Sequence, residues 1–83
     1  MLTEYDIISA TWVADQTIFV MFGDGTAGEI DFSSLLRGPL YEELLITGTF
    51  QQFIVSSETG TIVWVNGLDV APEVVRRHIT QTP

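Results

Sequence analysis

The sequence predicts a small α+β domain, in which an antiparallel sheet (a three-stranded meander plus a later β-hairpin) is packed with short helices and a C-terminal helix. Three observations lead to this prediction. Short segments rich in β-branched and aromatic residues have the length of strands. Gly-Asp-Gly and Ser-Glu-Thr-Gly separate pairs of these segments, as tight turns do. Apolar residues follow helical spacing after a proline near the end. With 83 residues, we expect residues 1–83 to form a single domain.

The first 32 residues are expected to form the meander. Residues 5–14 alternate imperfectly between apolar and polar, which indicates a half-buried strand. Residues 18–22 read IFVMF, a short apolar run typical of a central strand. Asp24 and Gly25 predict the tight turn that follows, because glycine adopts positive φ at low steric cost. Residues 26–32 then return as the third strand.

Two short helices are predicted after the meander. The first covers residues 34–37, and Asp31 or Ser33 can cap it by accepting a hydrogen bond from an unpaired backbone N–H. Gly38 ends it, and Pro39 suits the first position of the second helix. Three leucines of this second helix are expected to share its apolar face: Leu40, Leu44 and Leu45.

The remaining elements are a hairpin and a final helix. Residues 53–55 and 61–65 are strand-like and flank the turn at residues 57–60. The last helix is expected to run from Pro72 to about Thr80, with apolar residues at helical spacing.

All three basic residues lie at the ends of predicted helices, where a cation complements the negative end of the helix dipole. These residues are Arg37, Arg76 and Arg77. Phosphate binding by Arg76 and Arg77 is the alternative, and the acidic background argues against it.

Composition and charge exclude several function classes. Eleven acidic residues against three arginines give a formal net charge of −8, which repels nucleic acid and anionic membranes. No apolar run has the length of a membrane span, and the start lacks the basic and apolar regions of a signal peptide, so we expect a cytoplasmic protein. Only 17% of the residues are charged, too few to cover the surface, which favours an exposed apolar patch.

Few side chains are suited to catalysis. The chain has no cysteine, and its single histidine, His78, has no acid at a helical spacing that would bring the two together. We therefore predict no catalytic residue, no cofactor and no metal ligand. An alternative hypothesis is a metal-binding or enzymatic domain that uses the carboxylates of Glu29, Asp31 and Asp69.

The segment WVNGLDVAPE, residues 64–73, contains the most distinctive combination of residues. Trp64 closes a strand, and Asn66-Gly67 favours a turn with left-handed φ. Pro72 suits the first position of a helix, and Asp69 and Glu73 place negative charge beside that helix N-terminus. We interpret Trp64, Asn66, Asp69 and Pro72 as a structural joint or as part of a surface for a partner.

These features together resemble a bacterial family, the domain of unknown function 2442 family. The resemblance runs from about Ile7 to Ile79 and is carried by FGDGTAGEIDFSSLL, GPLYEELLITGTF and WVNGLDVAPE. It implies a compact α+β domain, which in some relatives precedes a helix-turn-helix domain. It also implies a small companion protein encoded by a neighbouring gene, in an arrangement similar to a toxin–antitoxin pair. The family has no established catalytic residues to transfer.

The function we expect is that of an acidic, non-enzymatic protein–protein interaction module. Its partner is expected to be another protein, such as a small basic toxin encoded by a neighbouring gene, which this chain would neutralise as an antitoxin. The acidic charge then steers association with a basic partner. A second alternative is a self-assembling homodimer that buries the exposed apolar patch.

Overall fold

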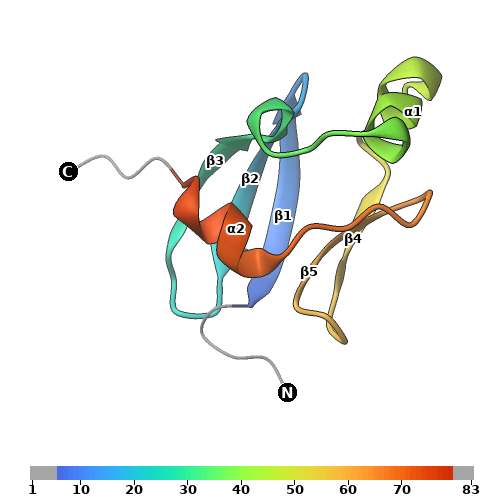
Figure 1. The fold of residues 1–83 in the computed structure, drawn as a ribbon. Coiled ribbons are helices and arrows are strands. Elements are labelled where there is room, and N and C mark those ends of the chain that lie inside the picture. Colours follow the sequence, from blue (N-terminus) through green and yellow to red (C-terminus); the bar gives the residue numbers. More distant parts are fainter. Residues whose placement is uncertain (1–5, 80–83) are drawn as a thin grey trace.

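The computed structural model describes residues 6–79 and has an α+β fold, as predicted (Figure 1). Five strands form two antiparallel sheets, accompanied by two α-helices and one 3₁₀ helix within this described part of the chain. In chain order the elements are β1 (Ile7–Ala14), β2 (Thr17–Phe22), β3 (Ala27–Asp31), η1 (Phe32–Ser34), α1 (Pro39–Thr47), β4 (Phe53–Ser56), β5 (Thr61–Trp64) and α2 (Pro72–Arg77).

The first sheet is the predicted meander, with strand order β1-β2-β3. The central strand β2 alternates strictly: Ile18, Val20 and Phe22 are fully buried, while the residues between them are only partly buried. A period of two places alternate residues on opposite faces of a strand, so one face of β2 is directed into the core. The edge strand β1 is irregular at both ends and mostly exposed.

The second sheet is the later hairpin, in which β4 pairs with β5. It is a separate sheet, because no backbone ladder among residues 6–79 joins it to the meander. The two sheets meet where the backbone N–H of Ile7 donates to the carbonyl of Gly60, at 2.8 Å.

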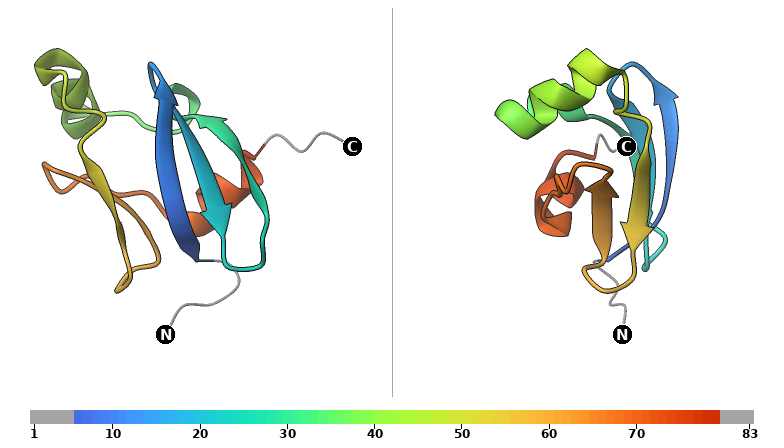
Figure 2. Two further views of the ribbon diagram at one scale, coloured as in Figure 1. Left: turned by 180° about the vertical axis from the view of Figure 1, so that it is seen from behind. Right: turned by 90° about the vertical axis from the view of Figure 1, so that its right-hand side faces the viewer.

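The core lies between the two sheets and the helices. Both α1 and α2 lie on the same side of the meander, and α2 crosses its buried face (Figures 1 and 2). Fifteen apolar side chains of the described residues form one buried cluster, contributed by the strands, the helices and the connecting segments. Those exposed by less than 2% are Phe22, Phe32, Ile7, Ile18, Ile30, Leu44, Ile62, Val20 and Val75.

Three local expectations are corrected by the structure. The first helix is a 3₁₀ turn at Phe32–Ser34, not an α-helix at residues 34–37, and Asp31 is its cap. Arg37 therefore lies beyond this helix and does not complement its dipole. The final helix ends at Arg77, before the expected end at Thr80, which lies outside the described residues.

The apolar face of α1 also differs from the prediction. Of the three leucines only Leu44 is buried, and its buried neighbour on the helix is Tyr41. Leu40 and Leu45 flank this pair and remain 45% and 41% exposed. Residues three apart share a helix face, and the core contacts only the narrow face around Tyr41 and Leu44. The tyrosine ring, not the three leucines, defines the direction of this helix.

Gly60 at the contact between the two sheets provides a test of their packing. Its φ of +68° is unfavourable for other residues, and a Cβ there would collide with the side chain of Asp6. Gly25 has a similar φ of +89° but open space around it. We expect Gly25→Ala to lower the free energy of unfolding by about 1–2 kcal/mol, from backbone strain alone. Gly60→Ala should lower it by roughly 1–3 kcal/mol more, because the added methyl group overpacks the contact with Asp6. Equal losses in urea unfolding experiments would contradict this account of the contact.

Candidate functional site

Trp64, at the end of β5, is an internal anchor. Its side chain is 2% exposed, and its indole Nε1–H donates to the carbonyl of Phe50 at 2.8 Å. Its ring lies 5.4 Å from that of Phe50, 5.7 Å from Phe32 and 6.0 Å from Phe53, measured between centroids. Tilted and edge-on contacts of this kind add to the free energy of burial. Trp64 therefore has a structural role in the hairpin.

Asn66 joins the turn after β5 to helix α1. Its Nδ2 donates to the carbonyl of Leu40 at 2.9 Å and to Oε1 of Glu43 at 3.0 Å. Its Oδ1 accepts from the backbone N–H of Leu68 at 3.2 Å. Gly67 follows with φ of +90°, the left-handed turn that the sequence predicted. An asparagine amide is needed here because one group must both donate and accept.

Asp69 and Pro72 occupy different parts of the joint between β5 and α2. Pro72 is the first residue of α2, as predicted. Asp69, three residues before Pro72, forms an isolated antiparallel bridge with Val63 of β5. The acid in the first turn of α2 is Glu73, and the cap residue Ala71 makes no side-chain hydrogen bond. Asp69 is exposed at the surface.

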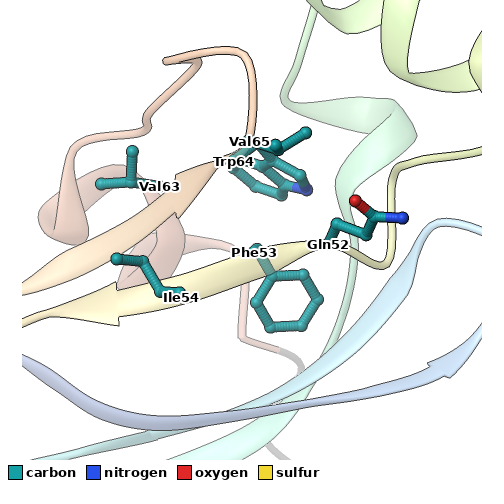
Figure 3. Close-up of a pocket in the computed structure, with 6 residues that line it drawn as sticks. All are labelled: Gln52, Phe53, Ile54, Val63, Trp64 and Val65. Carbon is teal, nitrogen blue, oxygen red and sulfur yellow. The ribbon is translucent and has the colours of Figure 1, made fainter.

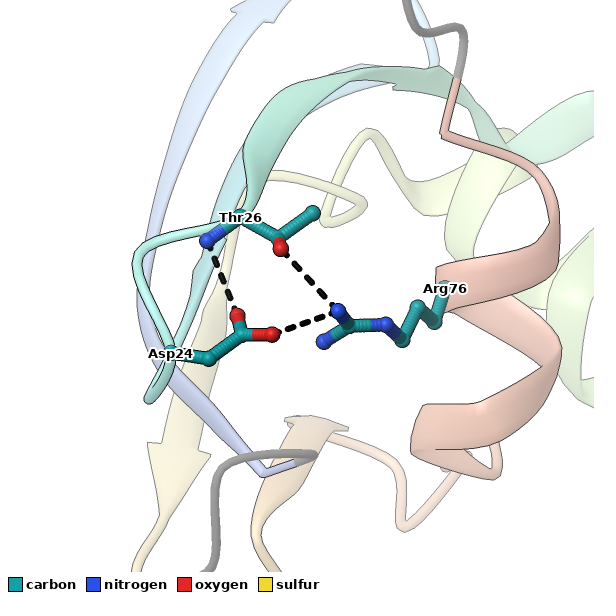
Figure 4. A network of polar contacts seen from close by, with 3 residues as sticks. All are labelled: Asp24, Thr26 and Arg76. Atoms are coloured by element: carbon teal, nitrogen blue, oxygen red, sulfur yellow. Dashed lines mark hydrogen bonds and ion pairs between the residues drawn. The ribbon is translucent and has the colours of Figure 1, made fainter.

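The Asp24-Gly25 turn holds helix α2 against the meander (Figure 4). Asp24 Oδ1 accepts from the backbone N–H of Thr26 at 2.9 Å, and Oδ2 forms a 2.6 Å ion pair with Arg76. The same Arg76 nitrogen donates to Oγ1 of Thr26 at 3.0 Å. The guanidinium also lies over the ring of Phe22, 5.1 Å from its centroid, in a cation–π contact.

The Arg76 guanidinium holds the pKa of Asp24 well below its usual value, and the hydrogen bonds from Thr26 act in the same direction. The sequence predicted that Arg76 would interact with the dipole of its own helix, and it did not predict the ion pair with Asp24. The two residues are 52 positions apart, and no local pattern relates them.

The three carboxylates of the metal hypothesis do not come together. Asp31 accepts hydrogen bonds from the backbone N–H and the hydroxyl of Ser33, at 2.9 and 2.6 Å, which lower its pKa. Glu29 lies opposite Phe19 on the meander, whereas Asp69 belongs to the second sheet. Within residues 6–79, no three acidic or histidine side chains gather as metal ligands would. His78 is exposed beyond α2, with Nδ1 2.9 Å from the carbonyl of Val74.

A shallow apolar hollow of about 330 Å³ lies over the second sheet (Figure 3). It is lined by residues from β4, β5 and the positions next to them: Gln52, Phe53, Ile54, Val63, Trp64 and Val65. Ile54 and Val65 are 66% and 64% exposed, although both are large and apolar. The low charged fraction of the sequence predicted an exposed apolar patch, but nothing in the sequence located it here.

The two α-helices are short, with nine and six residues. Within residues 6–79, neither has the length and apolar character that a membrane crossing requires.

Asn66→Asp tests the connection between the hairpin and α1. The variant keeps the acceptor for Leu68 but loses both donated hydrogen bonds, and it places a carboxylate against Glu43. We expect a loss of about 1–3 kcal/mol in unfolding free energy at neutral pH. The loss should shrink below pH of about 4, where a protonated carboxyl can donate.

The matched control for this variant is Gln51→Glu, which makes the same change from amide to acid at an exposed position. It should change the unfolding free energy by less than about 0.5 kcal/mol. If both variants lose the same amount in urea titrations, the added charge alone explains the effect and the role of Asn66 is wrong.

The Asp24–Arg76 pair should make stability depend on pH. Because the pKa of Asp24 is lowered in the folded state, its contribution is fully present above the unfolded-state value of about 3.9. It is lost as the pH falls below that value toward the folded-state pKa. We expect Asp24→Asn to be less stable than the wild type above pH of about 4 and to approach it at lower pH.

The measurement for this prediction is urea unfolding across the acidic range, repeated in an Arg76→Gln background. Removing the partner should abolish most of the difference that Asp24→Asn makes, because Arg76 is the largest cause of the pKa shift. A pH-dependent difference of undiminished size without Arg76 would contradict the ion pair as its main source.

Comparison with known proteins shows the family of this chain. No curated protein and no solved structure matches it. Residues 7–81, nearly the whole chain, match the model of a family described as Protein of unknown function (DUF2442). The resemblance inferred from the distinctive segments of the sequence is thereby confirmed, and the chain belongs to the DUF2442 family.

Proposed function

We propose that this protein is a non-enzymatic interaction module that binds a basic protein partner. The observation that carries the proposal is the coexistence of a strongly acidic chain with large apolar side chains left in solvent. Ile54 and Val65, which both line the hollow over the second sheet, are 66% and 64% exposed, on a chain of net charge −8. Exposed apolar side chains of this size mark interaction surfaces when they gather in a patch.

The use of the polar side chains supports a binding role over catalysis. Asp24 and Asp31 stabilise turns, Asn66 joins two elements, and the Trp64 indole is hydrogen-bonded inside the core. A catalytic acid or base needs a reacting group within hydrogen-bond reach and access to substrate. These four side chains are instead directed to neighbouring parts of the protein itself.

The charge of the chain supports a basic partner. Complementary fields accelerate association and suppress binding to acidic proteins. The family resemblance points in the same direction, toward a small basic toxin encoded by a neighbouring gene, with this chain as its antitoxin-like partner. In that arrangement the acidic module would neutralise the toxin by covering it.

Self-assembly is the second candidate, and strand β1 favours it. This edge strand exposes three large apolar side chains: Ile8, Trp12 and Val13, at 43%, 37% and 42%. Edge strands offer unpaired backbone groups to another chain. Repulsion between two copies that each carry a charge of −8 opposes this assembly.

Co-expression with the product of the neighbouring gene tests the proposed function. We expect the two proteins to copurify at low salt and the association rate to fall steeply as salt screens the charges. An unrelated acidic domain of similar net charge, captured in parallel, is the control for nonspecific attraction. The proposal fails if no complex forms at any salt concentration, or if the control domain captures the product equally well.

A further inference from the structure

We propose that the outer face of the second sheet is the docking surface, and that it accepts a basic partner segment presenting apolar side chains next to Lys or Arg residues. This β4–β5 face consists of Gln52, Ile54, Val63 and Val65. Two carboxylates lie near it: Asp69 is bridged to Val63, and Glu43 accepts a hydrogen bond from Asn66, the residue after Val65. The inference rests on the proposed function and deepens it by naming the surface and the chemistry of the partner.

The register of the hairpin defines which side chains form this face. Ile54 is paired with Val63, and the N–H of Val65 donates to the carbonyl of Gln52 at 3.1 Å. Paired residues project to the same side of a sheet, and neighbours along a strand project to opposite sides. Phe53 and Trp64, also a pair, project to the inner side, where their ring centroids lie 6.0 Å apart and both pack with the core.

The inner side anchors this face in one conformation. Trp64 and Ile62 are buried directly beneath it, at 2% and 0% exposure. Asn66 fixes the end of the hairpin to α1 through two donated hydrogen bonds. A surface that is already rigid loses little conformational entropy when a partner binds. More of the free energy of apolar contact over the hollow therefore remains as binding free energy.

Two carboxylates give the face its charge preference. Asp69 is bridged to Val63, so its exposed side chain projects from the same side as the apolar row. Glu43 is held by Asn66, the residue directly after Val65. None of the three arginines lines the hollow, and Arg76 is engaged with Asp24 at the other sheet. A cationic side chain from a partner that covers the apolar row can therefore pair with a carboxylate beside it.

The same charges argue against a second copy of this chain as the occupant. A symmetric pairing would bring like patches together, including Asp69 and Glu43 of both copies. Like charges held in a contact of low dielectric constant cost free energy. A basic partner reverses the sign of that interaction.

The experiment uses a random peptide library displayed on phage as the probe and the full chain as the target. We expect the selected peptides to be enriched in apolar residues flanked by Lys or Arg. The double variant Ile54→Ser with Val65→Ser should weaken their binding about tenfold or more, because it removes the central apolar contacts. Ile46→Ser is the matched control: Ile46 is 84% exposed on α1 and does not line the hollow, so its replacement should leave binding unchanged.

A second pair of variants tests the charges. Asp69→Asn with Glu43→Gln should weaken binding and reduce its salt dependence. The amide oxygen that Glu43→Gln introduces can still accept the hydrogen bond from Asn66, so the hairpin stays attached to α1. Glu29→Gln, on the meander, removes the same kind of charge away from the face and should have a smaller effect. Circular dichroism and melting temperatures establish that each variant is folded.

Three results would overturn the assignment. Selected peptides whose binding survives the Ile54 and Val65 changes would place the docking surface elsewhere. Peptides enriched in acidic residues would contradict the charge preference. A wild-type dimer in sedimentation that dissociates in the Ile54 and Val65 variant would make a second copy the occupant. Each of these results leaves the copurification test of the proposed function independent, because that test does not depend on which surface binds.

Discussion

The contact of the Trp64 indole with the aromatic cluster is the constraint on which the rest of the structure depends. The ring is contributed by the second sheet, and its neighbours Phe32 and Phe50 come from the segments before and after α1. Burying an aromatic side chain of this size contributes about 5 kcal/mol of transfer free energy. The hydrogen bond from Nε1 to the Phe50 carbonyl fixes the orientation of the indole ring. It also satisfies a buried N–H group that would otherwise have no partner. This one residue therefore sets the position of the hairpin relative to η1 and α1. Asn66, two residues later, also connects the hairpin to α1 through its hydrogen bonds to Leu40 and Glu43.

A separate set of contacts places α2. The helix has only six residues, too few to be stable alone, so it depends on tertiary contacts. Val75 supplies the buried apolar contact, and Arg76 reaches the Asp24 turn and lies over Phe22. This acidic protein has only three arginines, and one of them, Arg76, binds α2 to the first sheet. The acids elsewhere remain in excess, which is the electrostatic basis of the proposed preference for a basic partner.

The outer face of the second sheet follows from the same architecture. Trp64 and Phe53 occupy the inner side of a two-stranded sheet, so the alternate residues must project outward. On that side Ile54 and Val65 remain exposed to solvent. Exposed apolar side chains of this size lower solubility, and the net charge of −8 offsets that effect. Their exposure supports the proposal that a partner covers them.

The sequence by itself determined the fold class, the order of the elements, and the chemistry of the turns. Alternation along β2, the Asp24-Gly25 turn, the Asp31 cap and Pro72 as the start of α2 are all local properties, and local patterns report them directly. Only the tertiary structure decided which face of α1 is buried, that Asp69 bridges to Val63, that Arg76 pairs with Asp24, and where the exposed apolar side chains gather. Each of these depends on contacts between different elements, and the separation of partners such as Asp24 and Arg76 leaves no periodic signal in the sequence. The candidate surface is of this second kind, because its apolar row comes from two strands and its flanking carboxylates from a bridge and a helix.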